Sequence, residues 1–259
     1  MLPGVVDEIF AFLFGACIGS FLNVCIYRIP ESRSIVTPPS SCPRCGTEIK
    51  PYDNIPMLSW LLLRGKCRHC KTSISARYPA VELITGVAAL SLYLKFGLTP
   101  AFPVFFLFVA MLIVITFIDV DHQIIPNRLS LPGIPLFFLL SLAIPQISWT
   151  GSLIGILAGG GSLYLVAWVY HLFTGKEGMG MGDVKLLAMI GALIGWKGVL
   201  FTIFISSAAG TLAGLAVMIA SRRSLKTALP FGPFLAIGAI TYVFFGPQII
   251  TGYLRLVVG

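Results

Sequence analysis

Long apolar runs separated by short polar stretches dominate this chain of 259 residues. The runs cover approximately residues 9–26, 80–97, 101–119, 129–147, 152–173, 184–196, 198–221 and 230–251. A membrane-spanning helix needs about 20 predominantly apolar residues. The pattern therefore predicts an all-α polytopic membrane protein, surrounded by lipid, with about eight transmembrane helices. The short run at 184–196 indicates a helix that is tilted, broken or joined to its neighbour.

One long polar segment interrupts this pattern and divides the chain into three regions. We expect a first transmembrane span at 1–28, a polar segment at 29–78 and a multispan helical domain at 79–259. Charged residues make up only 11% of the chain, against about 25% in soluble domains. Asp7 and Glu8 are acidic where a cleavable signal peptide would be basic, so we expect the first run to remain as a span.

Positive charge is concentrated in the polar segment. Nine of the 18 Lys and Arg residues lie between Arg28 and Arg77, and the net charge is +8. If this segment is cytoplasmic, the N-terminus lies outside and only Lys95, Lys197 and Arg255 accompany it there, as the positive-inside rule favours. The cluster lacks a recognisable nucleic-acid module, so we expect no nucleic-acid partner. The remaining basic residues then fall inside: Arg128, Lys176, Lys185, Arg222, Arg223 and Lys226.

Two aspartates at the ends of apolar runs form the candidate catalytic pair. Asp183 lies in a glycine-rich break, Gly178-Met-Gly-Met-Gly-Asp-Val-Lys185, and Asp119 directly follows the apolar run 104–118. Ionisable residues at membrane depth are costly and mark functional sites, and glycines allow close backbone approach. Asp121 lies further out, and residues two apart do not share a helix face. We therefore expect Asp119, rather than Asp121, to meet Asp183 at the cytoplasmic boundary.

Such a carboxylate pair has the chemistry of an aspartic protease. Two carboxylates in one site cannot both ionise easily, so the pair holds one proton between them. The pair can then deprotonate a water and protonate a carbonyl oxygen or a leaving amine. The structural alternative is that Asp183 caps the following helix and Asp119 pairs with Arg128.

Four cysteines of the polar segment form two Cys-x-x-Cys pairs separated by 21 residues. The spacing of Cys42, Cys45, Cys67 and Cys70 is typical of a tetrahedral four-cysteine zinc site, and Gly46 suits the tight turn after the first pair. Nothing indicates an open catalytic position, so we interpret the zinc as structural. The alternative of redox-active or disulfide pairs is disfavoured because the cytoplasm is reducing.

Several further blocks occur in order along nearly the whole chain. They are Gly15-Ala-Cys-Ile-Gly-Ser-Phe-Leu-Asn-Val-Cys-Ile-Tyr-Arg28, Asn54-Ile-Pro-Met-Leu-Ser-Trp60, Arg77-Tyr-Pro-Ala-Val-Glu-Leu83, the Asp119 to Asn127 segment, Gly180-Met-Gly-Asp-Val-Lys-Leu186 and Pro230-Phe-Gly-Pro-Phe-Leu235. With these blocks and the four cysteines, the chain resembles the type IV prepilin peptidases. These are intramembrane aspartic proteases of the G-x-G-D type that are also N-methyltransferases.

The resemblance implies a multi-pass enzyme of the bacterial inner membrane that works with pilus or type II secretion assemblies. It implies cleavage of prepilin and pseudopilin leaders on the cytoplasmic side, after a glycine and before a residue that is often Phe. The two catalytic aspartates of the family's pattern fall on Asp119 and Asp183. The family's second activity methylates the new N-terminal amine with S-adenosylmethionine, and members that carry the cysteine-rich segment are expected to be bifunctional.

No glycine-rich nucleotide fingerprint marks a methyl-donor site. Asn23, Arg28 and Glu82, at the ends of the first two spans, are the candidate donor-binding residues. Glu82 can recognise a cationic sulfonium or the substrate amine, or it can pair with Arg77. Asn23 can instead bridge two helices, and Gly15 and Gly19 can simply permit close helix packing.

Three rival hypotheses remain at this point. A multispan transporter would use the acidic pair as a proton relay, but it would place carboxylates near the bilayer midplane and show a repeat. Neither feature is visible in the sequence. A non-catalytic scaffold of a secretion assembly would tolerate Asp183→Asn. A peptidase of the same fold that lacks methylation is the closest rival.

Overall fold

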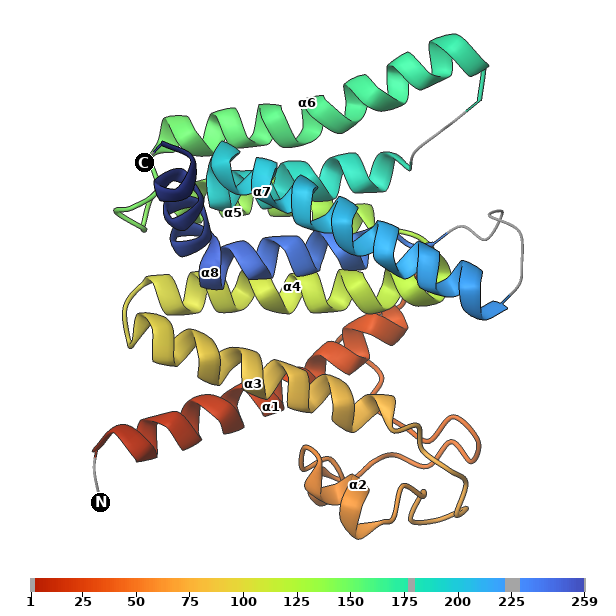
Figure 1. Ribbon diagram of the computed structural model, residues 1–259. Helices are drawn as coiled ribbons and strands as arrows, with labels where there is room; N and C mark the ends of the chain where they lie inside the picture. The colour runs from red at the N-terminus through yellow and green to blue at the C-terminus, as the bar shows by residue number, and fades with distance from the viewer. Residues whose placement is uncertain (1–2, 177–179, 222–228, 259) are drawn as a thin grey trace. The chain divides into compact units, whose positions relative to one another are not determined.

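The computed structural model describes residues 3–176, 180–221 and 229–258, and these form helices joined by loops (Figure 1). Gly178 and Met179 of the glycine-rich stretch, and the basic residues Arg222, Arg223 and Lys226, lie outside the described residues. The all-α prediction is confirmed. The elements are α1 (Pro3–Arg28), η1 (Pro51–Asp53), α2 (Leu58–Leu62), α3 (Arg77–Phe96), α4 (Ala101–His122), α5 (Asn127–Ser141), α6 (Trp149–Thr174), α7 (Met181–Ser221) and α8 (Gly232–Val258).

Within the described ranges, six helices are long and apolar enough to cross a membrane, where the sequence predicted about eight spans. The expected spans at 184–196 and 198–221 are both present in α7, which consists of two helical segments that meet at a non-helical break at Gly195 (φ 69°, ψ 178°) and count as one of the six. The expected span at 129–147 is α5, which has only 15 residues and contains Pro132 and Pro135. At 1.5 Å per residue, α5 is about 22 Å long and falls short of a hydrocarbon layer of about 30 Å.

The chain divides into two compact units, residues 1–114 and 115–259, and α4 runs through the division. In the first unit, α1 packs against α3. A Cβ atom on Gly15 would lie 2.5 Å from the Cβ of Ala89, and one on Gly19 would lie 2.7 Å from the Cα of Glu82. Both glycines therefore permit the close helix packing that the sequence suggested for them.

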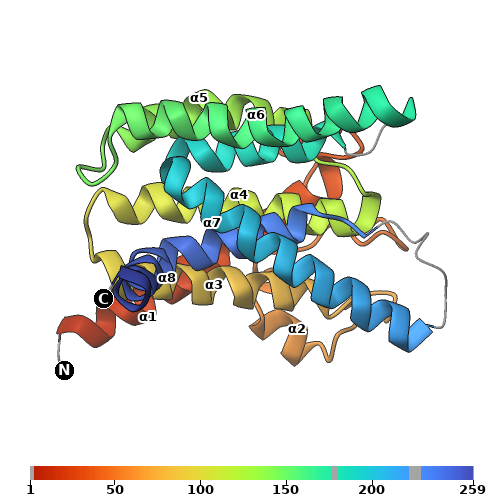
Figure 2. The same cartoon turned by 45° about the horizontal axis from the view of Figure 1, so that its top comes forward.

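In the second unit, α7 packs against α5, α6 and α8 (Figure 2). The contact with α6 is made through backbone, because a Cβ atom on Gly155 would overlap the carbonyl oxygen of Gly191 and lie 2.8 Å from the Cα of Gly195. Gly159 similarly abuts the carbonyl group of Leu187. Small residues in membrane helices allow such close approach. This packing fixes the first half of α7, which carries Asp183.

We expect Gly155→Ala to separate α6 from α7 and to lower stability by about 1–3 kcal/mol, the usual range for overpacking. Gly161→Ala on the same helix is the matched control, because a Cβ atom there meets nothing within 4 Å. The measurement is the thermal unfolding midpoint of both variants in one detergent. Equal midpoints would contradict the packing described here.

Candidate active site and metal centre

Three helix ends of the second unit bring the candidate catalytic groups together. Asp119 lies in the last turn of α4 with 5% of its surface exposed. Asp183 lies in the first turn of α7 and is half-buried. The two carboxylates are close enough for the charge of Asp119 to act on Asp183. Asp121 is exposed on the same helix end as Asp119, so the expected distinction between these two residues agrees with their burial.

The chain turns sharply after Asp119 and then begins α5. The backbone N–H of Gln123 donates to the Asp119 carbonyl oxygen at 2.8 Å, and Gln123 itself has a positive φ of 53°. Pro126 then precedes α5, and its extended backbone (φ −63°, ψ 123°) cannot continue α4. This turn is why the carboxylate ends a helix rather than lying in its middle.

The first residue of α8 contacts Asp119 directly. The Gly232 N–H donates a hydrogen bond to Asp119 Oδ2 at 2.9 Å. A Cβ atom on Gly232 would lie 2.7 Å from the same oxygen, so a larger residue there would displace the carboxylate. Helix N-termini favour neighbouring negative charge. In the sequence Gly232 stood out only as part of a family block, so this role was missed, although a glycine before Pro233 is a recognisable helix start.

The loop between α4 and α5 packs onto the start of α7. A Cβ atom on Gly182 would lie 2.9 Å from the Cβ of Ile125. Lys185 Nζ donates to Asn127 Oδ1 at 2.9 Å, and the Asp183 N–H donates to the Gly180 carbonyl oxygen at 3.1 Å. The glycines around Asp183 thus allow the loop to lie close to the carboxylate-bearing turn, and Lys185 braces the loop.

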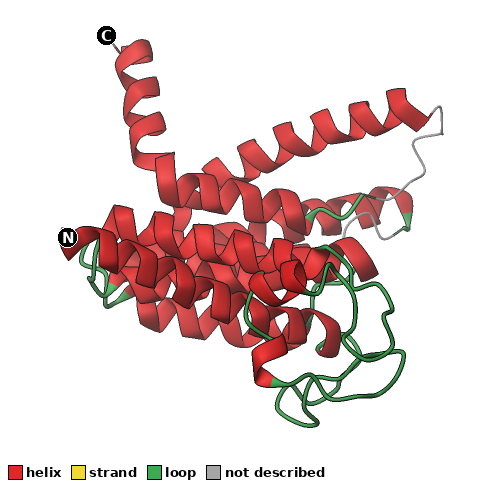
Figure 3. Cartoon of the chain, turned by 90° about the horizontal axis from the view of Figure 1, so that it is seen from below, coloured by secondary structure: helices red, strands yellow, loops and turns green. Residues whose placement is uncertain are grey.

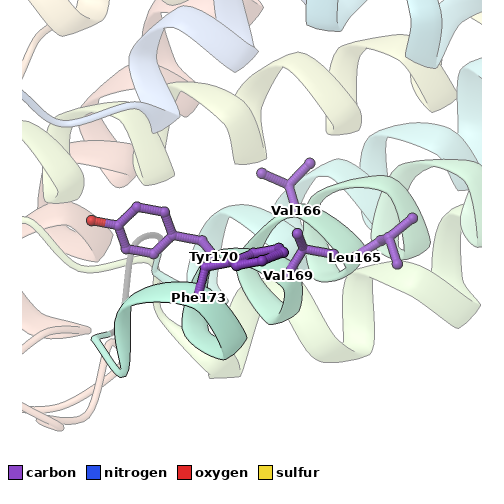
Figure 4. A pocket seen from close by; sticks show the side chains of 5 residues that line it. All are labelled: Leu165, Val166, Val169, Tyr170 and Phe173. Atoms are coloured by element: carbon purple, nitrogen blue, oxygen red, sulfur yellow. The ribbon is translucent and has the colours of Figure 1, made fainter.

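A separate hollow lies on the surface of α6 and has no catalytic character. Its lining residues all come from one helix (Figure 4). None of them is a carboxylate, a histidine or a lysine, and the one polar atom among their side chains is the Tyr170 hydroxyl. They are Leu165, Val166, Val169, Tyr170 and Phe173.

The four cysteines of the first unit converge, as their spacing predicted. Their sulfur atoms all lie within 4.8 Å of one another, and Cys42 Sγ lies 3.8 Å from Cys70 Sγ. Zinc–sulfur bonds of about 2.3 Å in a tetrahedron place sulfurs about 3.8 Å apart, so the cluster fits a metal ion. None of the six cysteines is in a disulfide.

The two Cys-x-x-Cys turns have the same backbone geometry. The N–H of Cys42 donates to the Thr47 carbonyl oxygen at 2.9 Å, and the N–H of Cys67 donates to that of Thr72 at 2.8 Å. Gly46 and the equivalent Lys71 both have positive φ, 70° and 57°. The tight turn expected at Gly46 is therefore present, and it is repeated at Lys71.

Polar contacts brace the second of these turns against η1. Arg68 Nε donates to both carboxylate oxygens of Asp53, at 2.8 and 3.0 Å. The Arg68 guanidinium holds the pKa of Asp53 below its usual range, and it also lies 5.6 Å from the centre of the Tyr52 ring.

In the first turn, hydrogen bonds from the Thr47 side chain and backbone lower the pKa of Cys45 to about 6.

The three candidate donor-binding residues have different hydrogen-bond partners. Asn23 Nδ2 donates to the carbonyl oxygens of Tyr78 (3.1 Å) and Gly19 (3.3 Å). Arg28 donates to two loop carbonyl oxygens, those of Ser34 (3.0 Å) and Pro38 (2.8 Å).

Glu82 is buried on α3 and accepts a hydrogen bond from the Met57 N–H at 2.7 Å. It also interacts with the Ser20 hydroxyl. Neither partner carries a positive charge. Met57 has a positive φ of 58°, so the block Asn54–Trp60 folds into a turn that aims this amide at Glu82.

Two family models match the chain. The bacterial Peptidase A24 N-terminal domain matches residues 13–96, and the type IV leader peptidase family, a family of aspartic proteases, matches residues 106–215. The first match covers the cysteine cluster and Glu82, and the second covers both aspartates.

Similar proteins extend over nearly the whole chain. A prepilin leader peptidase/N-methyltransferase of Pseudomonas aeruginosa is 39% identical over 94% of this chain and 92% of its own. A relative of the same name from Aeromonas salmonicida is 38% identical over 95% of this chain and 93% of its own. Another, from Burkholderia pseudomallei, is 34% identical over 95% of this chain and 87% of its own. No solved structure matches. The chain belongs to the prepilin leader peptidase/N-methyltransferase family, which confirms the resemblance drawn from the sequence.

Proposed function

We propose that this protein cleaves the leader peptides of type IV prepilins and pseudopilins and then N-methylates the new N-terminal residue. The observation that carries the proposal is the Asp119–Asp183 pair at the helix ends, in which Asp119 accepts a hydrogen bond from the Gly232 N–H. The relatives' names support both activities. The transporter alternative is not favoured, because the carboxylates lie at helix ends and the relatives are peptidases.

Hydrogen bonding gives the two aspartates different roles in the proposed cleavage. The Gly232 N–H stabilises a carboxylate at Asp119, so Asp119 acts as the base that takes a proton from water. The resulting hydroxide attacks the carbonyl carbon at the substrate's glycine junction, while Asp183 donates its proton to the carbonyl oxygen. Collapse of the tetrahedral intermediate breaks the C–N bond. The amine leaves with the proton that Asp119 holds, and Asp183 takes back a proton from a hydroxyl of the intermediate, which restores the pair.

The proposed location is the inner membrane, with the aspartates and the cysteine segment at its cytoplasmic face and the N-terminus outside. The charge distribution supports this orientation. The substrate's apolar helix would then lie in the membrane beside the protein, and its charged leader would remain in the cytoplasm. The products would serve a pilus or a type II secretion assembly.

For methylation, we propose that the Glu82 carboxylate binds the cationic ligand. S-adenosylmethionine supplies a reactive methyl group when it is bound, and the chain must hold the substrate amine in line with it. A buried carboxylate whose identified partners are a neutral amide and a hydroxyl suits a sulfonium or an amine. Asn23 and Arg28, which bond to main-chain carbonyl oxygens, would position the segment around this ligand.

Mass spectrometry of a prepilin-like substrate incubated with purified protein and S-adenosylmethionine tests both activities. The wild-type product should lack the leader and be heavier by one methyl group. Glu82→Gln should methylate about 10–100-fold more slowly, because hydrogen bonds to charged groups contribute about 1.5–3 kcal/mol, and should still cleave. Glu48→Gln, an exposed change in the polar segment, is the control.

Two results would count against these assignments. Intact substrate with the wild-type protein rejects the proposed function as a whole. Normal methylation by Glu82→Gln rejects the role of Glu82 and leaves cleavage unaffected.

We further propose that the cysteine cluster holds one structural Zn²⁺, because four thiolates complete a tetrahedron and leave no position for a reacting water. Elemental analysis should find about one zinc per chain in the wild type and close to none in Cys67→Ser. Cys17→Ala, which changes an exposed cysteine of α1, should keep its zinc. Wild-type zinc content in Cys67→Ser would refute the site.

A further inference from the structure

The segment between α1 and α3 consists mainly of loops and carries the short helix α2 (Figures 1 and 3). It bears an apolar surface outside the membrane-spanning helices. Ile55, Leu58, Leu61 and Leu62 are 46%, 57%, 62% and 81% exposed. We call these four residues the α2 face. Such a cluster in a water-exposed segment is unfavourable unless something covers it, and it marks a contact surface.

The orientation of this surface is fixed from the other side of α2. The Ser59 hydroxyl donates to the Tyr52 carbonyl oxygen at 3.0 Å and accepts from the Ile55 N–H at 3.0 Å. Trp60 Nε1 donates to the Ile74 carbonyl oxygen at 3.1 Å. The polar groups of α2 therefore bond to the segment itself, and the leucines are held outward.

Unbalanced positive charge borders the α2 face. Arg64, Lys66 and Lys71 follow α2 closely and are exposed. The ion pairs identified in the described ranges are Arg33–Glu31 and Arg68–Asp53, so two of the segment's three acids are already occupied by other arginines. An apolar helix face beside Lys and Arg residues is the pattern of helices that lie in a membrane interface.

The membrane surface is within reach of this face. The segment begins where α1 ends at Arg28 and finishes where α3 begins at Arg77, and both helices are long and apolar enough to cross a membrane. It therefore leaves and re-enters at one face of the bilayer. Fourteen residues separate Leu62 from Arg77, so α2 lies within about 50 Å of the start of α3.

We propose that the α2 face inserts into the headgroup layer of the cytoplasmic leaflet and that Arg64 and Lys66 contact anionic phospholipid. Apolar side chains then leave water, and each basic residue gains from the negative surface potential. The contact has a consequence for the proposed methylation site, because Met57, whose N–H donates to Glu82, directly precedes α2. Seating α2 on lipid would hold this amide in place.

Photocrosslinking from Leu62 tests the proposal in the full-length protein. Leu62→p-benzoylphenylalanine is reconstituted into vesicles of phosphatidylethanolamine and phosphatidylglycerol, or of phosphatidylcholine alone. We expect a protein mass increased by one phospholipid after irradiation, at least about fivefold more in the anionic vesicles. Arg64→Gln with Lys66→Gln should remove most of that difference. Glu48→p-benzoylphenylalanine, at an exposed acidic position, is the matched control and should crosslink little lipid.

Other occupants of the α2 face give different products. A crosslink to a peptide of the same chain means that another part of the protein covers the face, and a doubled mass means a second copy does. Either product overturns the proposal, as does a lipid yield at position 62 that equals the yield at 48 or is the same in both vesicle types. Zinc content and leader cleavage, measured on the same preparations, distinguish these results from misfolding and from failure of the proposed function.

Discussion

Replacing either Asp119 or Asp183 with Asn should slow leader cleavage by about 10³-fold. Asn is nearly isosteric but can neither take a proton from water nor donate one as an acid, and positioned acid–base groups contribute about 10²–10⁴ each. Because the pair acts as a unit, the double variant should be little worse than either single one. The rate is measured by mass spectrometry of the substrate at fixed protein concentration.

Asp121→Asn is the matched control, since Asp121 lies on the same helix end but is exposed. It should retain cleavage within about threefold of wild type, as surface substitutions usually do. Near-normal cleavage by Asp183→Asn would rule out the proposed protease mechanism. Loss of cleavage in Asp121→Asn, with activity kept in Asp119→Asn, would move the role to Asp121.

Gly232→Ala should reduce cleavage by about 10²-fold while leaving the protein folded. The new Cβ atom would lie 2.7 Å from Asp119 Oδ2, so the carboxylate must move. Displacements near 1 Å cost about that factor in rate. Cleavage rate and thermal unfolding midpoint are measured together, so that a local effect can be separated from a loss of stability.

Gly252→Ala on the same helix is the control, because a Cβ atom there meets nothing within 4 Å. A substrate whose leader has already been removed should be methylated normally by Gly232→Ala if the damage is confined to the aspartates. Wild-type cleavage by Gly232→Ala would show that the hydrogen bond to Asp119 does not position the base.

The sequence predicted the convergence of the four cysteines well, because the information that specifies it is local. Two Cys-x-x-Cys turns define their own geometry, and only the distance between them has to be closed by folding. The choice of Asp119 over Asp121 also followed from a local rule, helix periodicity together with depth. Both groups of residues could therefore be named before any tertiary contact was known.

Contacts between distant segments were beyond such rules. The hydrogen bond from Gly232 to Asp119 joins residues 113 positions apart, and no local pattern encodes it. The pairing of Gly155 with Gly191 depends on the angle between two helices. The number of long helices differed because an apolar run does not reveal that its helix stops short, as α5 does at Ser141, or how sharply two helical segments are divided, as they are at Gly195 of α7.

The shortness of α5 has a consequence for the bilayer itself. A helix of about 22 Å creates a hydrophobic mismatch with a hydrocarbon layer of about 30 Å, and lipids next to such a helix respond by thinning. Leu131, Leu136 and Leu139 are exposed on α5 and would meet those lipids. The thinned layer would border the turn that joins Asp119 to α5, so water would have a shorter path to the carboxylates here than in an unperturbed membrane.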